Sequence, residues 1–566
     1  MSVQEPDTVY TALAPPDSHP GFHYAGHVKL PGFQAFPVDV IWERDVAITM
    51  RDGVKLYTDI FRPESAQGQV PAIIPWGPYG KVGTSTLNYD DMGPWWIGIL
   101  YQHLSGYKTF ERSNPAEWCS KGYAVVDINA RGCGNSEGDI MFWGEQEATD
   151  IYDSITWVTQ QPWCNGSVLN FVSRFNHPNL KAIAPWEGLT DPYGQQFCRG
   201  GIPRPALGDL IIKGFAGRGR AENPSAMIKA RPLFDNYWEE KGTKPENIRD
   251  VLMYLTASYS NLLHSECSFH TFKVAQTSLK WLRVHASQEW HYLYQLKASD
   301  DLQRFFDFYA KGIQNGWEKD TPRVRLSLLG YDSSYSKTVV GRPEQQWPPA
   351  RQRLGRYYLD AASQSLAQTK ANTASQAIDK DHSLSDSSDF VLYFDKYTEI
   401  CGRPFVKLYM SCDAADDFNV VVQIRKISSS GEPLESLNWS PMPKPRPDVP
   451  NVNVAKHLGP QGMLRTSHHV SLRPRQCEDE VPQYDHNIRQ PITPGVVTPL
   501  LIPIWPVGIV FEASEGLMLR VTGHDMALPE TEALRLNTPI DENIGMHSIH
   551  TGGQHESYLV IPMITN

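Results

Sequence analysis

The sequence predicts an α/β domain with a parallel sheet, followed by an all-β domain. First, 566 residues exceed what a single hydrophobic core organises. Second, residues 123–129 and 180–185 are short apolar runs typical of buried strands, and residues 146–160 between them have the apolar spacing of an amphipathic helix. This alternation indicates parallel strands joined by helices. Third, from residue 323 short alternating segments are separated by turn residues, which favours a β-sandwich.

The other segments extend this architecture in chain order. They predict an N-terminal arm (1–40), a hairpin (46–63), a buried strand (71–75), two further core strands (251–261 and 279–290) and an amphipathic helix (301–316). The aromatic and charged segment before residue 250 is typical of a small helical cap. The expected organisation is an arm at 1–40, a first α/β part at 41–195, a cap at 196–250, a last α/β part at 251–320 and a β-sandwich at 321–566.

Composition excludes several classes of protein. The net charge of −11 gives no support for binding nucleic acid or an anionic membrane surface. No run approaches 18 uncharged apolar residues, so we expect no membrane span, and the first residues lack the pattern of a secretory signal. The eight cysteines are scattered without C-x-x-C spacing and favour reduced thiols over disulfides or zinc. The expected location is therefore cytoplasmic.

Several segments resemble one family. They are, in order, MRDGVKLYTDIFRP, YAVVDINARGCGNSEGD, ITWVTQQPWCNG, LKAIAPWEG and KWLRVHASQEW, with further matches near the C-terminus. Together they resemble the CocE/NonD hydrolases, the family of cocaine esterase and the X-prolyl dipeptidyl-peptidases. The resemblance implies an α/β-hydrolase domain with a helical cap, followed by an all-β jelly-roll sandwich domain. It also implies cleavage of a small ester or a peptide or amide bond by acyl transfer through a serine, without cofactor or metal.

The nucleophile turn of that family has no counterpart where the resemblance places it. In the family, the segment after Cys-Asn-Gly continues into a strand and then a G-x-S-x-G turn. Here only the 13 positions 167–179 join the two matching segments. A buried strand takes about 5 residues and a helix at least about 10, so strand, turn and full helix do not fit. Residues 169–179 look like the second half of that helix and its exit loop, and we expect the chain to lack the G-x-S-x-G turn.

The other catalytic positions can be carried over from the resemblance. His285 matches the catalytic histidine, which would take a proton from the nucleophile. Asn261 matches the acid position, where the cocaine-esterase pattern has aspartate, and an amide cannot stabilise an imidazolium as a carboxylate does. Glu289 is a less favoured substitute acid. Tyr79 matches the oxyanion tyrosine, with aromatic packing beneath the cap as the alternative role.

The remaining candidates favour structural roles. Ser167 and Ser173 lie in the short segment without the glycines two positions before and after that a G-x-S-x-G turn has, and the histidines at 547, 550 and 555 favour structural use over metal binding. Three functional hypotheses remain open: a serine hydrolase of the family, an inactive relative that binds a small ligand or a protein partner, and the product of a misread or alternatively spliced gene. Substrate identity and oligomeric state are not predicted by the sequence.

Overall fold

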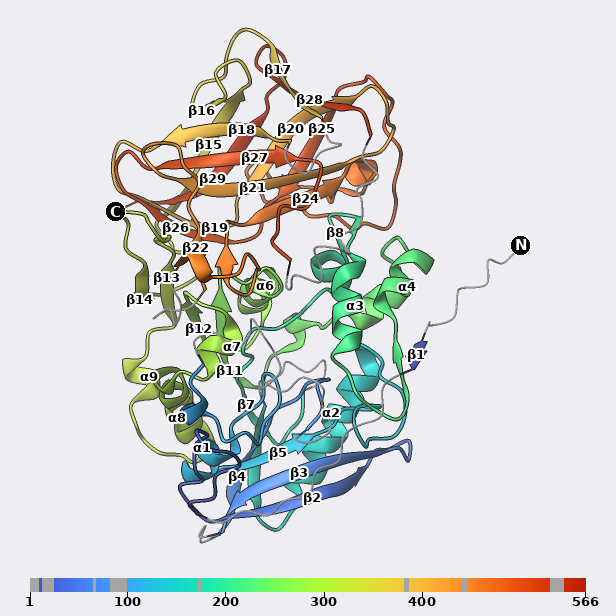
Figure 1. Cartoon of the computed structure of the whole chain (residues 1–566), viewed down its shortest axis with the longest axis vertical. Coiled ribbons are helices and arrows are strands. Elements are labelled where there is room, and N and C mark those ends of the chain that lie inside the picture. Colours follow the sequence, from blue (N-terminus) through green and yellow to red (C-terminus); the bar gives the residue numbers. More distant parts are fainter. Residues whose placement is uncertain are drawn as a thin grey trace, which may run out of the picture.

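The computed structural model describes residues 10–12, 25–64, 68–81, 99–169, 176–380, 386–438, 446–529 and 544–565. Two large sheets follow one another along the long axis of the molecule, with the α/β part below and the all-β part above (Figure 1). The predicted order of an α/β domain followed by an all-β domain is confirmed.

The lower sheet has the strand order β14-β13-β12-β11-β7-β6-β4-β5-β3-β2 among the described residues. The strands from β13 to β5 in this order pair in parallel, while β14, β3 and β2 pair antiparallel at the ends. Their bounds are β2 (Val40–Thr49), β3 (Lys55–Pro63), β4 (Val70–Ile74), β5 (Ala124–Ile128), β6 (Cys164–Leu169), β7 (Leu180–Ile183), β11 (Leu252–Ser258), β12 (Lys280–His285), β13 (Val324–Leu328) and β14 (Val339–Glu344). The predicted hairpin and core strands are present, although β12 ends at His285 and the predicted strand extended to 290. Strands β13 and β14, which were predicted to lie in the β-sandwich, join this sheet because β13 pairs with β12.

The helices of this part are α1 (Pro115–Ser120), α2 (Gly144–Thr159), α6 (Ser265–Val274), α7 (Glu289–Leu293), α8 (Leu296–Ala310) and α9 (Trp317–Asp320). The helix predicted at 301–316 is α8, which begins and ends earlier than expected. Gly312 and Gly316 have left-handed backbone conformations (φ 71° and 78°), which end the helix and lead the chain into α9. Phe305 and Phe306 on α8 are buried.

The segment predicted as a helical cap contains α3 (Pro205–Lys213), α4 (Pro224–Ala230) and α5 (Asn236–Lys241), with short strands β8 (Cys198–Arg199), β9 (Ile202–Pro203) and β10 (Arg220–Glu222). Strand β1 (Tyr10–Ala12) of the N-terminal arm pairs antiparallel with β10. The short 3₁₀-helices η2 (Tyr101–His103) and η4 (Pro245–Asn247) and the π-helix η3 (Tyr193–Phe197) lie in the connections.

The upper part is a large mixed sheet, in which β16 and β18 pair in parallel and the other described pairs are antiparallel. Its elements are β15 (Gln352–Asp360), β16 (Ser365–Ala367), β17 (Ser375–Lys380), β18 (Ser388–Tyr393), β19 (Thr398–Gly402), β20 (Phe405–Cys412), β21 (Asn419–Ile427), β24 (Gln461–Arg465), β25 (Thr498–Pro503), β26 (Val507–Phe511), β27 (Gly516–Thr522), β28 (Met546–Thr551) and β29 (Tyr558–Ile564), with a separate pair β22 (Ser436–Leu437) and β23 (Lys456–His457) and the turns η5 (Arg446–Asp448) and η6 (Thr466–Ser471).

Aromatic packing joins the two parts just after β11. The Tyr259 ring stacks on Phe269 at 4.8 Å, and Phe269 stacks on Trp347 at 4.1 Å. The Trp347 indole donates to the Tyr259 hydroxyl at 2.9 Å, and that hydroxyl lies 3.3 Å from the sulfur of Cys401 on β19. The loop that follows β11 is therefore held against the all-β part.

The expectation for residues 169–179 is partly wrong. Leu169 is the last residue of β6, which pairs in parallel with both β4 and β7, so the sheet contains the strand that precedes the expected position of the nucleophile turn. Residues 176–179 form a turn before β7, in agreement with the predicted exit loop. The positions between, including Ser173, lie outside the described residues.

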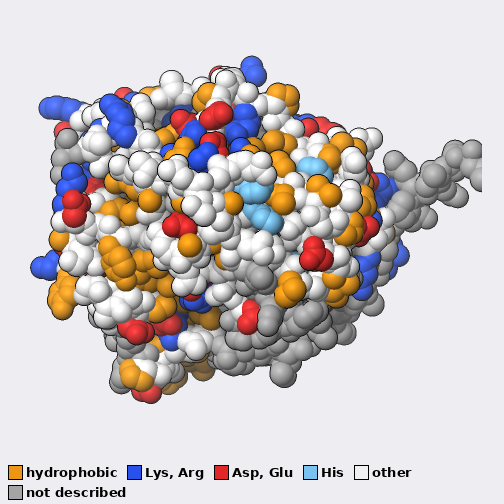
Figure 2. Space-filling view, turned by 90° about the horizontal axis from the view of Figure 1, so that it is seen from above, with side chains coloured by type: hydrophobic (Ala, Val, Ile, Leu, Met, Phe, Trp, Pro, Cys, Tyr) orange, Lys and Arg blue, Asp and Glu red, His pale blue; other side chains and the backbone are white. Residues whose placement is uncertain are grey.

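The upper face shows charged side chains of both signs interspersed with hydrophobic ones (Figure 2). Among the described helices, none is long and apolar enough to cross a membrane.

Candidate active site

The candidate residues gather at the carboxyl ends of adjacent parallel strands. His285 is the last residue of β12 and is in register with Ser258, the last residue of β11. Asn261 follows β11, and Glu187 follows β7, the next strand in the sheet. Parallel strands end at one edge, where α/β folds place their ligands. The structure thus brings together two residues singled out from the sequence and one that was missed.

His285 contacts a glutamate that sequence reasoning did not identify. Its Nε2 atom lies 2.9 Å from Oε1 of Glu187, and both side chains are buried. On the other side of the ring, Nδ1 lies 3.5 Å from the Ser287 hydroxyl. The Tyr292 ring stacks on the imidazole at 4.3 Å with an angle of 8°. Burial, and then the charge of Arg283, lower the pKa of His285 to about 3, so the imidazole is neutral at neutral pH.

Asn261 binds carboxyl groups and does not reach the imidazole. Its Nδ2 atom donates to Oε2 of Glu187 at 2.7 Å and also donates to Glu289. Its Oδ1 atom accepts from the backbone N–H groups of Leu263 and His264 at 2.8 and 3.1 Å. Among the described residues, the carboxyl group that touches His285 is therefore Glu187, while Glu289, the substitute acid considered from the sequence, contacts the amide of Asn261.

Glu187 has a left-handed backbone conformation (φ 60°). Such a conformation in a residue other than glycine costs about 1–3 kcal/mol and persists only where the surroundings impose it. Burial raises the pKa of Glu187 well above its usual range, and the hydrogen bond from Asn261 opposes that shift only in part. The buried Glu187 carboxyl group therefore favours its neutral form, and it lies beside an imidazole that is also neutral. The sequence signal that could have identified Glu187 is its position between Trp186 and Gly188, in the segment that follows the buried strand β7.

Two further glutamates complete an acidic group that we call the glutamate cluster, defined as Glu111, Glu187 and Glu289. Glu111 and Glu289 share a hydrogen bond. Burial, and then the charge of Glu187, raise the pKa of Glu111 to about 7, while the bond to Glu289 lowers it. Glu111 also has positive φ (59°). Two carboxyl groups this close cannot both ionise easily, because like charges repel in a buried site.

Tyr79 lies beside the same cluster. It follows β4, its ring meets Phe110 edge-on at 5.2 Å, and it also packs on Phe215. Burial raises the pKa of the Tyr79 hydroxyl well above its usual range, and the charges of Glu111 and Glu289 raise it further. The hydroxyl therefore remains a hydrogen-bond donor, which an oxyanion role requires.

The described residues leave the nucleophile open. Ser167 belongs to β6, where its backbone is in register with Ala72 and Leu180, but its side chain lies outside the described residues, as does Ser173. A G-x-S-x-G pattern does occur elsewhere in the chain, at residues 134–138 (GNSEG), so the expectation that the chain lacks the pattern is wrong. This pattern follows β5, and its serine is buried.

Ser136, the serine of that pattern, has a structural role. Its hydroxyl donates to the carbonyl oxygen of Asn129 at 2.8 Å and accepts from the N–H of Tyr57 at 2.9 Å. We expect Ser136→Ala to lower the free energy of unfolding by about 1–3 kcal/mol, because a buried backbone donor loses its partner. Urea unfolding checks this, and Ser363→Ala, at an exposed hydroxyl, is the control. An unchanged urea midpoint would refute the structural role.

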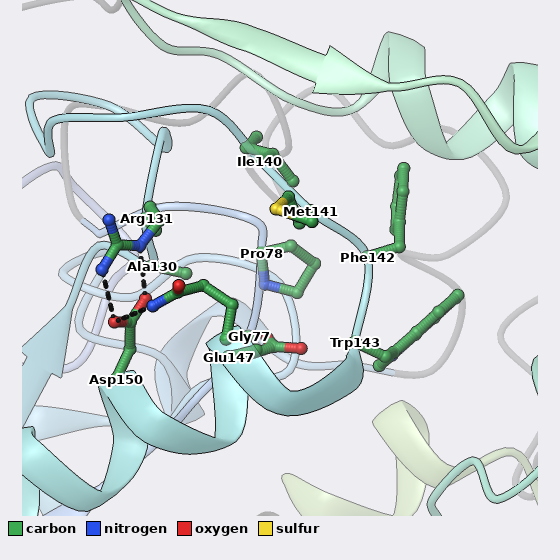
Figure 3. Close-up of a pocket in the computed structure, with 11 residues that line it drawn as sticks. Gly77, Pro78, Ala130, Arg131, Ile140, Met141, Phe142, Trp143, Glu147 and Asp150 are labelled. Carbon is green, nitrogen blue, oxygen red and sulfur yellow. Dashed lines mark hydrogen bonds and ion pairs between the residues drawn. The ribbon is translucent and has the colours of Figure 1, made fainter. Parts of the chain in front are cut away.

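A small pocket lies beside the loop that carries Tyr79 (Figure 3). Its volume is about 40 Å³, and it lies between Gly77–Pro78, residues 140–143 and the first turns of α2. On its wall Arg131 makes two bonds to Asp150, at 2.8 and 2.7 Å. Glu147 accepts from the Trp76 indole at 2.9 Å, and burial raises its pKa to about 7. Binding pockets for drug-sized ligands measure about 300–1,000 Å³, so this pocket accommodates water or a small group.

Comparison with known proteins agrees with the fold. The protein-family model for X-Pro dipeptidyl-peptidase (S15 family) matches residues 52–297. The family model for the X-Pro dipeptidyl-peptidase C-terminal non-catalytic domain matches residues 315–560. The chain is similar to a CocE/NonD family hydrolase from Staphylococcus aureus, with a TM-score of 0.83 and 28% identity over 93% of this chain and 94% of that one. It is 32% identical to the cocaine esterase of Rhodococcus over 160 residues, which are 26% of this chain and 24% of the esterase. The match thus spans about a quarter of that curated relative.

Proposed function

We propose that this chain, which belongs to the CocE/NonD hydrolase family, has a site suited to an ester or to a peptide or amide substrate. We also propose that this polypeptide catalyses acyl transfer little or not at all. Members of the family act on ester or peptide bonds. In the proposed site, His285 holds the position of the general base, Asn261 that of the acid and Tyr79 that of an oxyanion donor.

The contact between His285 and Glu187 carries this proposal. In a serine hydrolase, Nε2 of the histidine faces the serine hydroxyl and takes its proton, while a carboxylate binds Nδ1. Here Nε2 lies 2.9 Å from a glutamate oxygen, and Nδ1 faces Ser287. A buried carboxyl group on the nitrogen that must receive the proton supports a site without an active serine.

The length of the chain between β6 and β7 supports the same conclusion. The two strands are in register at Leu169 and Ile183, and only positions 170–179 lie between them. A parallel connection with a covering helix needs a dozen or more residues. An exposed nucleophile turn followed by a full helix does not fit in ten. Asn261 further weakens base catalysis, because an amide carries no negative charge.

We expect the purified protein to show no stoichiometric reaction with a fluorophosphonate probe, because no hydroxyl is activated beside His285. Peptide mapping after labelling checks Ser167 and Ser173 directly. In an enzyme with a working triad, loss of the histidine lowers kcat by several orders of magnitude. Because we propose that this chain has no working triad, we expect wild-type protein and His285→Ala to hydrolyse 4-nitrophenyl acetate at the same rate. Stoichiometric labelling of either serine, or a large loss of rate in His285→Ala, would contradict the proposal.

Sequencing the transcript across codons 166–170 separates a real loss from a splicing product. A transcript that encodes no additional residues supports a binding scaffold that descends from hydrolases. Additional codons with a G-x-S-x-G turn would assign full hydrolase activity to the longer product, and the site of this chain would then be an incomplete form of it.

A further inference from the structure

The site contains a second group of side chains with its own chemistry. Glu111, His264 and Glu289 each offer one potential ligand atom, and these atoms lie within 4.8 Å of one another. They come from three separate segments: the loop before α1, the residue that precedes α6, and the first residue of α7. Neither serine chemistry nor the fold assigns a role to this combination.

The orientation of His264 favours a metal ligand. Its Nδ1 atom lies 3.2 Å from the carbonyl oxygen of Gly188. A carbonyl oxygen only accepts hydrogen bonds, so Nδ1 carries the proton and Nε2 presents a lone pair. Histidines that bind metals usually donate their other N–H to a carbonyl or carboxylate in this way, which fixes the tautomer and the direction of the ring.

The carboxyl groups are arranged around this histidine. Glu111 and Glu289 share a hydrogen bond, so their oxygens already converge. Asn261 donates through one nitrogen to Glu289 and to Glu187, which orients both side chains from outside the group. Such amide contacts are typical of the residues that support metal ligands. The amide of Asn261 can therefore donate hydrogen bonds to both glutamates. An aspartate at the same position would add a further negative charge and could not orient them in this way.

Two buried atoms at the edge of the group are an independent observation. Oε1 of Glu187 and Nε2 of His285 lie 2.9 Å apart, yet neither makes a hydrogen bond of acceptable geometry with any described residue. Buried polar atoms in native proteins nearly always have such a partner, and those that do not require an explanation. The other oxygen of Glu187, Oε2, shares the Asn261 donor with Glu289, so one of the two unpartnered atoms belongs to a side chain that is bridged to a proposed ligand.

We propose that Glu111, His264 and Glu289 bind one divalent metal ion of the zinc type. One imidazole and two carboxylates are suitable ligands for Zn²⁺, which leaves a fourth position of the tetrahedron for water or a ligand. Binding would require the three ligand atoms, which lie within 4.8 Å of one another, to converge to about 2.0–2.2 Å from the ion. This proposal goes beyond the hydrolase assignment and does not depend on a serine nucleophile.

Titration of the full-length protein with ZnCl₂, after treatment with EDTA and dialysis, tests the proposal by calorimetry. We expect one tight equivalent in the wild type, and at least about 100-fold weaker binding in His264→Ala and in Glu289→Gln, because each removes a ligand. His270→Ala is the matched control, because it changes a histidine on α6, the helix that His264 precedes. We expect its affinity for Zn²⁺ to be unchanged. Co²⁺ in place of Zn²⁺ should give the visible absorption of a four-coordinate ion in the wild type and not in Glu289→Gln.

Three results would overturn the proposal. They are the absence of a tight equivalent in the wild type, wild-type affinity in both ligand variants, and loss of the site in His270→Ala alone. If metal binding is lost only when the histidines at 547, 550 and 555 are replaced, the ion binds in the all-β part and the proposal is wrong. If His264→Ala does not fold, the comparison rests on Glu289→Gln and Glu111→Gln, which preserve side-chain shape.

Discussion

Asp301→Asn should destabilise the α/β part by about 3–5 kcal/mol, because one carboxylate on α8 holds two buried arginines from two strands. Asp301 accepts from Arg283 on β12 at 2.8 Å and from Arg325 on β13 at 2.6 and 2.9 Å. The hydroxyl of Tyr254 on β11 donates to the same carboxylate. All four side chains are largely buried, so the neutral amide would leave two guanidinium groups close together without a counter-charge.

The neighbouring residue provides a matched control for this prediction. Asp300 also lies on α8, but its side chain is 71% exposed and its ion pair with Lys121 measures 3.3 Å. Asp300→Asn should change the free energy of unfolding by no more than about 0.5 kcal/mol, because exposed pairs contribute little. Urea unfolding, followed through the transition of the α/β part, measures both variants. Equal midpoints for the two variants would show that Asp301 does not hold the strands.

The effect of Asp301→Asn should depend on pH in a defined direction. Burial raises the pKa of Asp301, but the hydrogen bond and charge of Arg325 and the charge of Arg283 outweigh it, so the folded pKa is below the usual value of 3.8. A depressed carboxyl pKa stabilises the folded state above the pKa of the unfolded chain, and the stabilisation is lost as the pH falls through the folded pKa. The difference between wild type and variant should therefore be constant above about pH 5 and close in stronger acid.

Local patterns predicted most of the fold because they are set by neighbouring residues. The apolar run at 123–129 became β5, and the helical spacing at 146–160 became α2. The end of α8 was missed because Gly312, with positive φ, follows its last turn, and periodicity alone does not show where a glycine leaves the helical conformation. Boundaries set by single backbone conformations are the least predictable feature of a sequence.

The segment between β6 and β7 shows a second limit. Counting positions predicted that a strand, a turn and a full helix do not fit within 167–179. The strand is nevertheless present, because it begins at Cys164, inside the segment counted before the gap. Val70 on β4 is already in register with Cys164, so pairing starts three residues earlier than the count assumed. Strand length depends on the partner strand, and a single segment does not reveal its partner.

The site was predictable where a residue ends a strand and unpredictable where loops meet. His285 and Asn261 were found because strand ends and the family resemblance both point to them. Glu187 lies 74 positions from Asn261 in the sequence, and Glu289 lies 28 positions away. Contacts between loops over such separations depend on the tertiary fold, and no local spacing encodes them.

Arg112→Met is the second variant for which we expect a large effect, because the guanidinium of Arg112 is buried and holds the loop that precedes Tyr79. It donates to the carbonyl oxygens of Pro75 and Gly77, both at 2.8 Å, and to that of Ile128 at 3.0 Å. It also forms an ion pair with Asp127, whose side chain is buried as well. Removal of one partner of such a pair typically destabilises a protein by about 3–5 kcal/mol.

Arg112→Lys should not restore stability, because an ammonium group has no planar fork to reach several carbonyl oxygens at once. Arg51→Met is the control, since Arg51 makes a similar forked pair with Asp153 but is 58% exposed, and we expect little change in its urea midpoint. Hydrogen exchange at residues 75–81 should accelerate in both Arg112 variants under conditions where they remain folded, because the Tyr79 loop loses its anchor. Wild-type exchange in that loop, together with a wild-type midpoint, would show that other contacts hold Tyr79 beside the glutamate cluster.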